Sequence, residues 1–189
     1  MNVDRPVAQP SSSDEHWAPD HLVLDRRVLQ YAGRLLVEHD DDGHILEYSP
    51  LAGMAAVEQR YPAWALGPFG RVEPERGLPE LPGVYALVEQ GVVRYVGSTV
   101  NLARTFDARH GLGHISRRDC QLSKHEERCR LNRLVVASAK AGRVVDVYLI
   151  TTQDTKRRPW TSTARAGAVP AALATQLARS ARGSWHLPS

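Results

Sequence analysis

Two short runs rich in strand-forming residues, 83–88 and 92–96, are separated by only three residues, the last of which is Gly91. Apolar strand formers on both sides of a short glycine-containing turn predict a β-hairpin. Thr99 or Asn101 can then cap a helix that begins directly after the second strand. This strand-turn-strand-helix order restricts the fold more than any other feature of the chain.

Further along the chain, the apolar residues of 127–141 recur every three or four positions, which predicts a second helix that ends at Gly142. Residues 144–150 are apolar and β-branched and predict a third strand. Pro170 stands at a typical first position for a last helix, over 171–182. The fold class we expect is therefore α+β, with a small, mainly antiparallel three-stranded sheet flanked by helices.

The first part of the sequence is less regular. Residues 1–20 are polar and predict a disordered arm, and 21–80 predict an N-terminal α+β extension with a connector rich in proline. Within the extension, 21–37 is compatible with a helix, 34–48 favours a hairpin around an acidic turn, and 51–60 favours another helix. The point at which helix gives way to strand stays open. Residues 81–189 are expected to form the main domain.

Composition limits the classes of protein to consider. A chain of 189 residues with 42% hydrophobic and 24% charged residues fits one principal globular domain. It has no apolar stretch long enough to span a membrane, so no membrane partner is expected. The N-terminus lacks a secretory pattern, and Cys120 and Cys129 are too few for a disulfide framework. Both observations favour a cytoplasmic location.

Charge is distributed unevenly along the chain. Residues 1–93 contain 7 Lys and Arg against 15 Asp and Glu, a net charge of −8, whereas residues 94–189 contain 17 against 6, a net charge of +11. Such an arginine-rich half is typical of a surface that binds phosphates, although plain solvated charge is the alternative. The nucleic-acid-binding candidates are the basic residues of two segments: Lys124, Arg128, Arg130 and Arg133, and then Lys156, Arg157 and Arg158.

The predicted hairpin also carries two spaced motifs. Gly83, Val84 and Tyr85 open its first strand, and Tyr95, Val96 and Gly97 lie near the end of its second, followed by an Asn-Leu pair. This pattern resembles the GIY-YIG nuclease family over about residues 81–187. The resemblance implies a DNA endonuclease that hydrolyses phosphodiester bonds and uses Mg²⁺ or Mn²⁺. The N-terminal extension could then contribute to target choice, by analogy alone.

Tyr85 and Tyr95 are the first candidates for catalytic residues. Two tyrosines that enter from the same sheet face of neighbouring strands can place two phenol oxygens near one water molecule. The resemblance implies that Tyr85 is the general base or water-positioning group and Tyr95 its partner. A free phenol has a pKa of about 10, so either would need help from a cation to act near neutrality. The alternative is an ordinary cross-strand aromatic pair.

The family's helical arginine is absent at its expected position. That position, ten residues after the second tyrosine, holds Thr105. Arg104 comes one residue earlier, and Arg109 lies four residues beyond Thr105, on the same face if the helix continues. Both arginines are candidates for stabilising the charge of the transition state. His110 is a further candidate, for orienting the phosphate or relaying a proton.

The carboxylate that holds the metal in the family is also absent. Aligning the last helix on the family pattern places Ala174 where a glutamate is expected and His186 where an asparagine is expected. Alanine offers no oxygen to a hard cation, so we expect no metal ligand at this position. Of the acidic residues downstream of Glu127, Asp154 is the one that could swing toward the site.

Two hypotheses follow. The first is a GIY-YIG-type endonuclease that is impaired or inactive because of Thr105 and Ala174; the sequence leaves open whether these two residues are natural or engineered. The second is a noncatalytic nucleic-acid-binding or interaction module that reuses the fold. A zinc site is a weaker alternative, because the two cysteines are nine positions apart in the chain, and the residues it would use are His110, His114, Cys120, His125 and Cys129.

Overall fold

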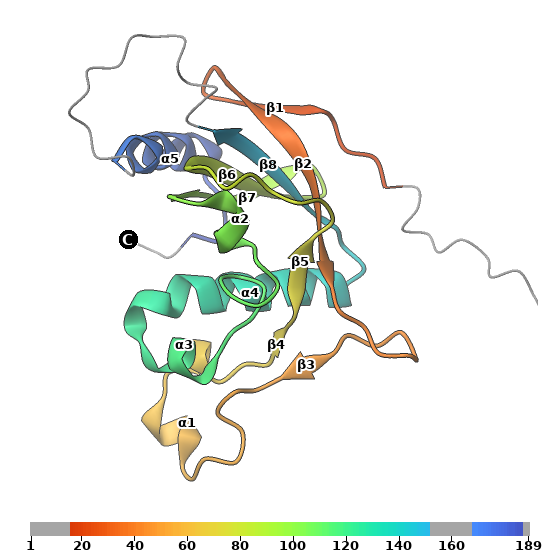
Figure 1. Ribbon diagram of the computed structural model, residues 1–189, viewed down its shortest axis with the longest axis vertical. Coiled ribbons are helices and arrows are strands. Elements are labelled where there is room, and N and C mark those ends of the chain that lie inside the picture. Colours follow the sequence, from red (N-terminus) through yellow and green to blue (C-terminus); the bar gives the residue numbers. More distant parts are fainter. Residues whose placement is uncertain (1–15, 152–167, 187–189) are drawn as a thin grey trace, which may run out of the picture.

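The computed structural model of the chain describes residues 16–151 and 168–186, which form an antiparallel sheet with helices on both faces (Figure 1). The strand order is β1-β2-β8-β6-β7, and β5 pairs with β2 beyond the end of β1. The strands of this sheet are β1 (His21–Leu24), β2 (Arg27–Val37), β5 (Val72–Pro74), β6 (Gly83–Glu89), β7 (Val92–Thr99) and β8 (Val145–Thr151).

The remaining elements lie around this sheet. A second, two-stranded sheet pairs β3 with β4 below it in Figure 1. These two strands and the helices are β3 (Glu47–Tyr48), β4 (Phe69–Gly70), α1 (Val57–Arg60), η2 (Ala63–Ala65), α2 (Leu102–Thr105), α3 (Arg117–Gln121), η3 (Ser123–His125), α4 (Glu126–Lys140) and α5 (Ala168–Ala181). No helix within the described ranges combines the length and apolar character required to cross a bilayer.

The predicted hairpin is confirmed as β6 and β7, and the predicted third strand is confirmed as β8. These three strands are neighbours in the order β7-β6-β8. The predicted sheet of three strands was too small, however, because β2 pairs with the free side of β8 and brings β1 and β5 with it. Strands from the predicted N-terminal extension therefore complete the main sheet.

The helix expected over 21–37 is wrong, because this segment forms the hairpin of β1 and β2. Asp25 and Arg26 have φ angles of 44° and 63°, which are the left-handed values of a two-residue hairpin turn. Gly33, with φ at 107°, lies where the register between β2 and β8 shifts. A glycine tolerates this backbone in a strand, whereas it weakens a helix interior.

The other two expectations for the extension hold only in part. The hairpin expected over 34–48 is reduced to one bridge between His39 and Ile45 around the acidic turn, and β3 pairs with β4 instead. The helix expected over 51–60 is reduced to α1, which has four residues. The predicted arm, residues 1–20, lies outside the described residues except for 16–20, which lie against β8.

Two helices cover opposite faces of the sheet. Ala174 and Leu177 of α5 pack on one face, mainly against β7 and β6, and Leu131, Val135 and Val136 of α4 pack on the other. The far side of α4 covers a third apolar cluster, to which Phe69 and Cys129 contribute. As a result α4 is covered on both sides, between the main sheet and the small lobe that contains α1, α3, β3 and β4 (Figure 1).

A buried carboxylate fixes the end of the β6–β7 hairpin against α4. Glu89 is 3% exposed. It accepts hydrogen bonds from Ser138 at 2.5 Å, from Arg143 at 2.8 Å and from Arg94 at 3.0 Å. Burial alone would raise the pKa of Glu89, but the bonds from Ser138, Arg143 and Arg94 outweigh it, so the pKa lies below its ordinary value of 4.5.

We therefore expect Glu89→Gln to lower the free energy of unfolding at neutral pH by about 1–3 kcal/mol, because Arg94 and Arg143 lose their charged partner. A carboxylate with a lowered pKa stabilises the fold fully above its unfolded pKa and loses that effect as the pH falls through the folded pKa. The difference between the two proteins should therefore shrink in acid. Urea unfolding at several pH values measures it, with exposed Glu58→Gln as the control. An equal difference at every pH would contradict this role.

Candidate functional site

Tyr85 and Tyr95 project from the same face of the sheet, the face covered by α4. Tyr95 pairs with Leu87 across the hairpin, and alternation along β6 places Tyr85 on the same side as Leu87. The two ring centroids lie 5.8 Å apart. The Tyr85 ring contacts Phe106 edge-on at 4.9 Å, and the Tyr95 ring stacks on His186 at 4.6 Å. Both tyrosines are buried, so these contacts fix their rings in place.

The second glycine of the motif pattern is required by the tyrosines themselves. A Cβ added at Gly97 would lie 2.6 Å from the Tyr95 ring and 2.7 Å from the Tyr85 ring. Gly83 is required for a different reason, because a Cβ there would lie 2.7 Å from the carbonyl oxygen of Ile150. The two glycines thus allow close packing around the tyrosine pair and at the β6–β8 junction.

Both phenols are protonated at neutral pH. Burial raises the pKa of Tyr85, and hydrogen bonding with Tyr95 offsets this only in part. Burial also raises the pKa of Tyr95, which the neighbouring Tyr85 and the negative charge of Glu127 raise further. In this state each phenol can donate a hydrogen bond, but neither can accept a proton as a general base.

Glu127 is the residue that the sequence analysis missed. It lies in the first turn of α4, is exposed, and interacts through its carboxylate with the Tyr95 phenol. Ala174 of α5 lines the same hollow as Glu127, Tyr95 and His186. A carboxylate is therefore present beside the tyrosine pair, but it comes from α4 rather than from the last helix. The sequence places Glu127 at a helix start, but only the packing of α4 against the sheet brings it to Tyr95.

His186 holds the chain after α5 against the edge of the sheet. Its Nε2 accepts a hydrogen bond of 3.1 Å from the backbone N–H of Val96, and the backbone N–H of Trp185 donates to the carbonyl oxygen of Arg94 at 2.9 Å. Burial lowers the pKa of His186, although the charge of Glu127 opposes this. The structure thus places His186 against Tyr95 as a neutral ring.

A hollow of about 570 Å³ opens beside Tyr85 and Glu127, and the candidates Arg104, Arg109 and His110 line it. The expected alignment of Arg109 with Thr105 on one helix face is wrong, because α2 ends at Thr105. Asn101 caps α2 by accepting from the N–H of Arg104 at 2.8 Å. The chain then folds back, and Arg109 and His110 reach the hollow from the loop that follows.

Thr105, at the position of the family's arginine, turns toward β7. Its hydroxyl lies 2.7 Å from that of Thr99 and 3.0 Å from the carbonyl oxygen of Asn101. The loop beyond α2 is held by the buried Asn132 of α4, which donates to the Leu112 carbonyl at 2.8 Å. These bonds give the hollow a fixed wall, although Thr105 itself contributes no charge.

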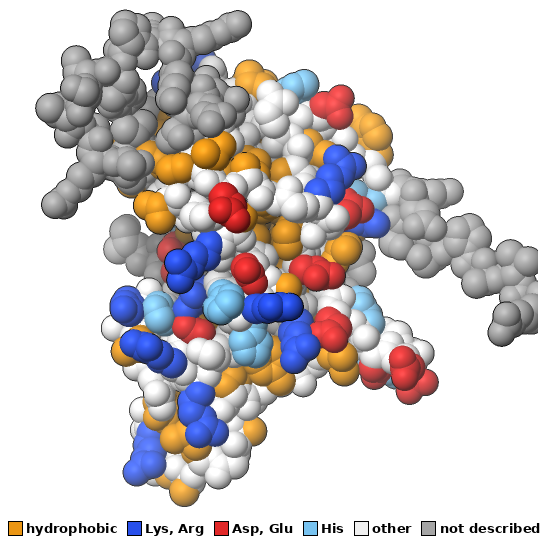
Figure 2. Space-filling model, viewed as in Figure 1, with side chains coloured by type: hydrophobic (Ala, Val, Ile, Leu, Met, Phe, Trp, Pro, Cys, Tyr) orange, Lys and Arg blue, Asp and Glu red, His pale blue; other side chains and the backbone are white. Residues whose placement is uncertain are grey.

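Several basic side chains around this hollow are available to a ligand. Four basic residues that line this hollow are exposed and form no ion pair within the described part of the chain: Arg104, Arg109, Arg118 and Lys124. Figure 2 shows Lys, Arg and His side chains gathered over α3, α4 and the segment between α2 and α3. This face of the molecule therefore presents positive charge next to the tyrosine pair.

The predicted nucleic-acid-binding arginines of α4 have other partners. Arg128 lines the hollow but pairs with Asp119, Arg130 lies 3.8 Å from Glu126, and Arg133 donates to the Ala63 carbonyl at 2.8 Å. Of this group, Lys124 and Arg128 line the hollow. The candidates Lys156, Arg157 and Arg158 lie outside the described residues.

The residues of the alternative zinc site do not converge. Cys120 and Cys129 are buried neighbours, and burial raises the pKa of their thiols to about 11 and about 12. The histidines have other partners: His110 lies 3.6 Å from Asp107, His125 lies 2.9 Å from Asp119, and His114 stacks on Tyr48. A structural zinc site needs four converging ligands, and within the described residues these two cysteines and three histidines do not come together as such a group.

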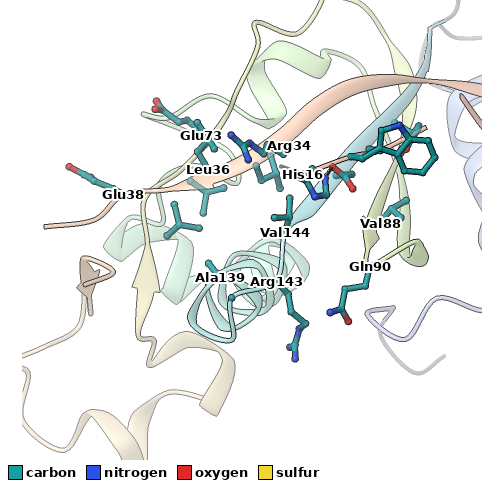
Figure 3. A pocket seen from close by; sticks show the side chains of 18 of the residues that line it. His16, Arg34, Leu36, Glu38, Glu73, Val88, Gln90, Ala139, Arg143 and Val144 are labelled. Atoms are coloured by element: carbon teal, nitrogen blue, oxygen red, sulfur yellow. Dashed lines mark hydrogen bonds and ion pairs between the residues drawn. The ribbon is translucent and has the colours of Figure 1, made fainter. Parts of the chain in front are cut away.

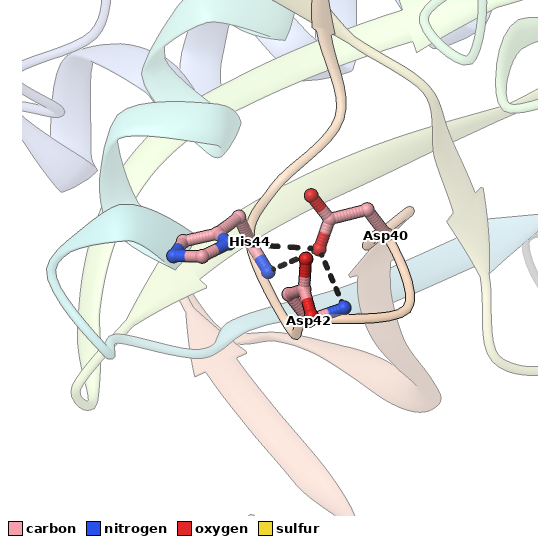
Figure 4. A group of neighbouring side chains, drawn as sticks. All are labelled: Asp40, Asp42 and His44. Atoms are coloured by element: carbon pink, nitrogen blue, oxygen red, sulfur yellow. Dashed lines mark hydrogen bonds and ion pairs between the residues drawn. The ribbon is translucent and has the colours of Figure 1, made fainter.

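One group of metal-binding residue types occurs elsewhere among the described residues, at the acidic turn (Figure 4). It consists of Asp40, Asp42 and His44, all exposed. The Asp40 carboxylate accepts the backbone N–H groups of Asp42 at 3.0 Å and of His44 at 2.8 Å. These hydrogen bonds are those of a tight turn, and they explain why the three side chains lie close together.

The largest hollow, of about 1360 Å³, lies at the other end of the sheet, between β2, β8 and the end of α4 (Figure 3). Its charged residues carry both signs, and Arg143 is already paired with Glu89. Of the described candidate residues, Arg109 alone reaches it. This hollow shares Arg109 with the one beside Tyr85, but Tyr85, Tyr95 and Glu127 do not line it.

The chain was compared with protein-family models, curated proteins and solved structures, and none of the three comparisons gave a match. The argument for function therefore depends on the site itself.

Gly97→Ala should lower the free energy of unfolding by about 1–3 kcal/mol, because the new methyl group meets both tyrosine rings. Gly77→Ala is the matched control, since nothing lies within 4 Å of a Cβ at that position. Thermal or urea unfolding of both variants measures the effect. If the two substitutions have equal effects, the close packing over Gly97 is contradicted.

Neither Tyr85 nor Tyr95 should ionise up to a pH of about 10, where an unperturbed tyrosine is half ionised. Carbon-13 NMR of the ring carbon that bears the hydroxyl group reports this directly, with Tyr85→Phe and Tyr95→Phe used to assign the two signals. A signal from either residue that titrates near pH 8 would show a phenol activated as a base.

Proposed function

We propose that this chain binds DNA beside Tyr85 and hydrolyses a phosphodiester bond at the Tyr85, Tyr95 and Glu127 group, as a GIY-YIG-like domain. The observation that carries the proposal is the convergence of two phenols and an exposed carboxylate next to unpaired basic side chains. Hydrolysis of a phosphodiester needs an oriented water molecule and positively charged groups beside the phosphate. The hollow offers groups of both kinds.

The order of elements adds support. The strands β7, β6 and β8 are adjacent, α2 follows the hairpin, and α5 follows β8, as the resemblance implies. The two motifs also meet in space, since Tyr85 pairs with Gly97 across the hairpin. The tyrosines were expected to share a sheet face, and they do.

The roles of the residues follow from their protonation. The phenols of Tyr85 and Tyr95, being protonated, orient a water molecule or a phosphate oxygen by donating hydrogen bonds. Glu127 is the group that can accept a proton from the attacking water, because its carboxylate is exposed at the edge of both hollows. Arg104 and Arg109 stabilise negative charge on the phosphate.

The hollow beside Tyr95 contains one side chain that can bind a divalent cation, although that side chain does not come from the last helix. Ala174 has no oxygen ligand, but Glu127 lines the same hollow. Mg²⁺ is commonly bound through one or two carboxylates together with substrate phosphates and water. Glu127 would hold such an ion and would then serve as its ligand rather than as the proton acceptor, and the ion would neutralise charge on the bound phosphate. The position of Thr105 leaves the site without the family's helical arginine, so we expect slow hydrolysis.

A second candidate function is a noncatalytic DNA-binding module. The observation that favours it is the hydroxyl of Thr105, which faces Thr99 and Asn101 and offers nothing to a phosphate. In that case the basic hollow would bind DNA, and the tyrosine pair would act only in packing.

The test is nicking of supercoiled plasmid in the presence of Mn²⁺. We expect slow nicking by the unmodified protein and a loss of about 100-fold or more with Glu127→Gln, because this removes the carboxylate that accepts the proton or holds the ion. Glu126→Gln is the matched control on the same turn of α4, and circular dichroism verifies folding. Tyr95→Phe should also slow nicking, and Thr105→Arg should accelerate it.

Two outcomes would overturn the proposed hydrolysis. Nicking that appears only after Ala174→Glu and Thr105→Arg are introduced would mean that Glu127 does not serve as the carboxylate. Salt-sensitive DNA binding without nicking by any of these variants would identify the noncatalytic module.

A further inference from the structure

A second hollow, also of about 570 Å³, lies at the free edge of β7 and meets the first at Glu127. Tyr95 to Ser98 of β7, part of α5 and the segment after it form its walls. Among the described residues, β7 has a neighbouring strand on one side only, and His186 and Trp185 form backbone hydrogen bonds with its other edge. The tyrosine pair and Glu127 therefore stand between two hollows.

The second hollow is positively charged. Arg179 and Arg182 line it from the end of α5, both are exposed, and neither forms a hydrogen bond or an ion pair through its side chain within the described part of the chain. Of the described residues in its wall, Glu127 alone is acidic. Two unpaired guanidinium groups next to an open strand edge suit phosphate oxygens, which arginine binds in a bidentate manner.

The first hollow repeats this arrangement on the other side of Glu127, with Arg104, Arg109, Arg118 and Lys124. Basic groups on one side only would suit a nucleic-acid end or a single phosphate. Basic groups in both hollows suit phosphates on both sides of the bond that is cut.

We infer that Arg179 and Arg182 form a second phosphate-binding arm, so that a continuous DNA strand crosses the tyrosine pair and an internal bond, not a chain end, lies at Glu127. This inference rests on the proposed function, since it takes DNA as the ligand. It adds a binding surface on α5 that the motif residues do not contain.

The experiment measures binding without cleavage, in the presence of a chelator. A fluorescent duplex of about three helical turns reports affinity by anisotropy at several salt concentrations, and the double variant Arg179→Gln with Arg182→Gln is compared with the unmodified protein. We expect affinity to fall about tenfold at low salt, and the slope of log affinity against log salt to fall by about 1.8, as for two lost phosphate contacts.

The matched control is Arg27→Gln with Arg60→Gln, which removes the same charge from exposed positions that line neither hollow. Basic residues near a helix end can also stabilise the helix itself. Thermal unfolding of both double variants separates that effect from binding. If the α5 variant loses stability but binds DNA as the control does, the second arm is refuted.

A competition experiment tests the internal position. Relaxed circular plasmid should displace the fluorescent duplex as well as the same plasmid after linearisation, because a continuous strand needs no end. Displacement by linear DNA alone would overturn the inference. Absence of salt-sensitive binding by the unmodified protein would instead reject the proposed function, so the two failures are distinguishable.

Discussion

The register of the β6–β7 hairpin decides whether a site can exist on this sheet. Tyr95 stands opposite Leu87, and Tyr85 opposite Gly97, so both rings share the face that α4 covers. A slip of one residue would turn Tyr95 to the α5 face, because successive side chains of a strand alternate. The same register sets both rings over Gly97, where any Cβ would collide with them. The hairpin thus makes the tyrosine pair and the glycine interdependent.

Burial has opposite consequences for structure and for chemistry at this site. The contacts of Tyr85 with Phe106 and of Tyr95 with His186 fix the rings, but the same burial raises the pKa of both phenols. A buried phenol is a good hydrogen-bond donor and a poor base. The proton acceptor that we propose is instead an exposed group, Glu127, which lies where the two hollows meet.

Local sequence signals were sufficient for β6, β7, β8, α4 and α5, because each combines a clear period with a turn or cap. They failed over 21–37, where apolar spacings of three and four coexist with β-branched residues and the Asp25-Arg26 turn has no glycine. The tyrosine pair followed from the hairpin together with the two spaced motifs. Glu127 did not, because its place beside Tyr95 depends on how α4 packs on the sheet, and no local pattern encodes that distance.

The sheet order gathers elements from the basic part of the chain at one edge. Strand β7 is the edge strand there, whereas β1, β2 and β5 lie at the other side and carry two Arg and one Glu among them. The elements that flank β7, namely α2, α4 and α5, come from the basic part. A polyanion that approaches is therefore attracted toward the β7 edge. Such a field orients the polyanion before any side chain contacts it. The polyanion would then arrive at the two hollows on either side of Glu127.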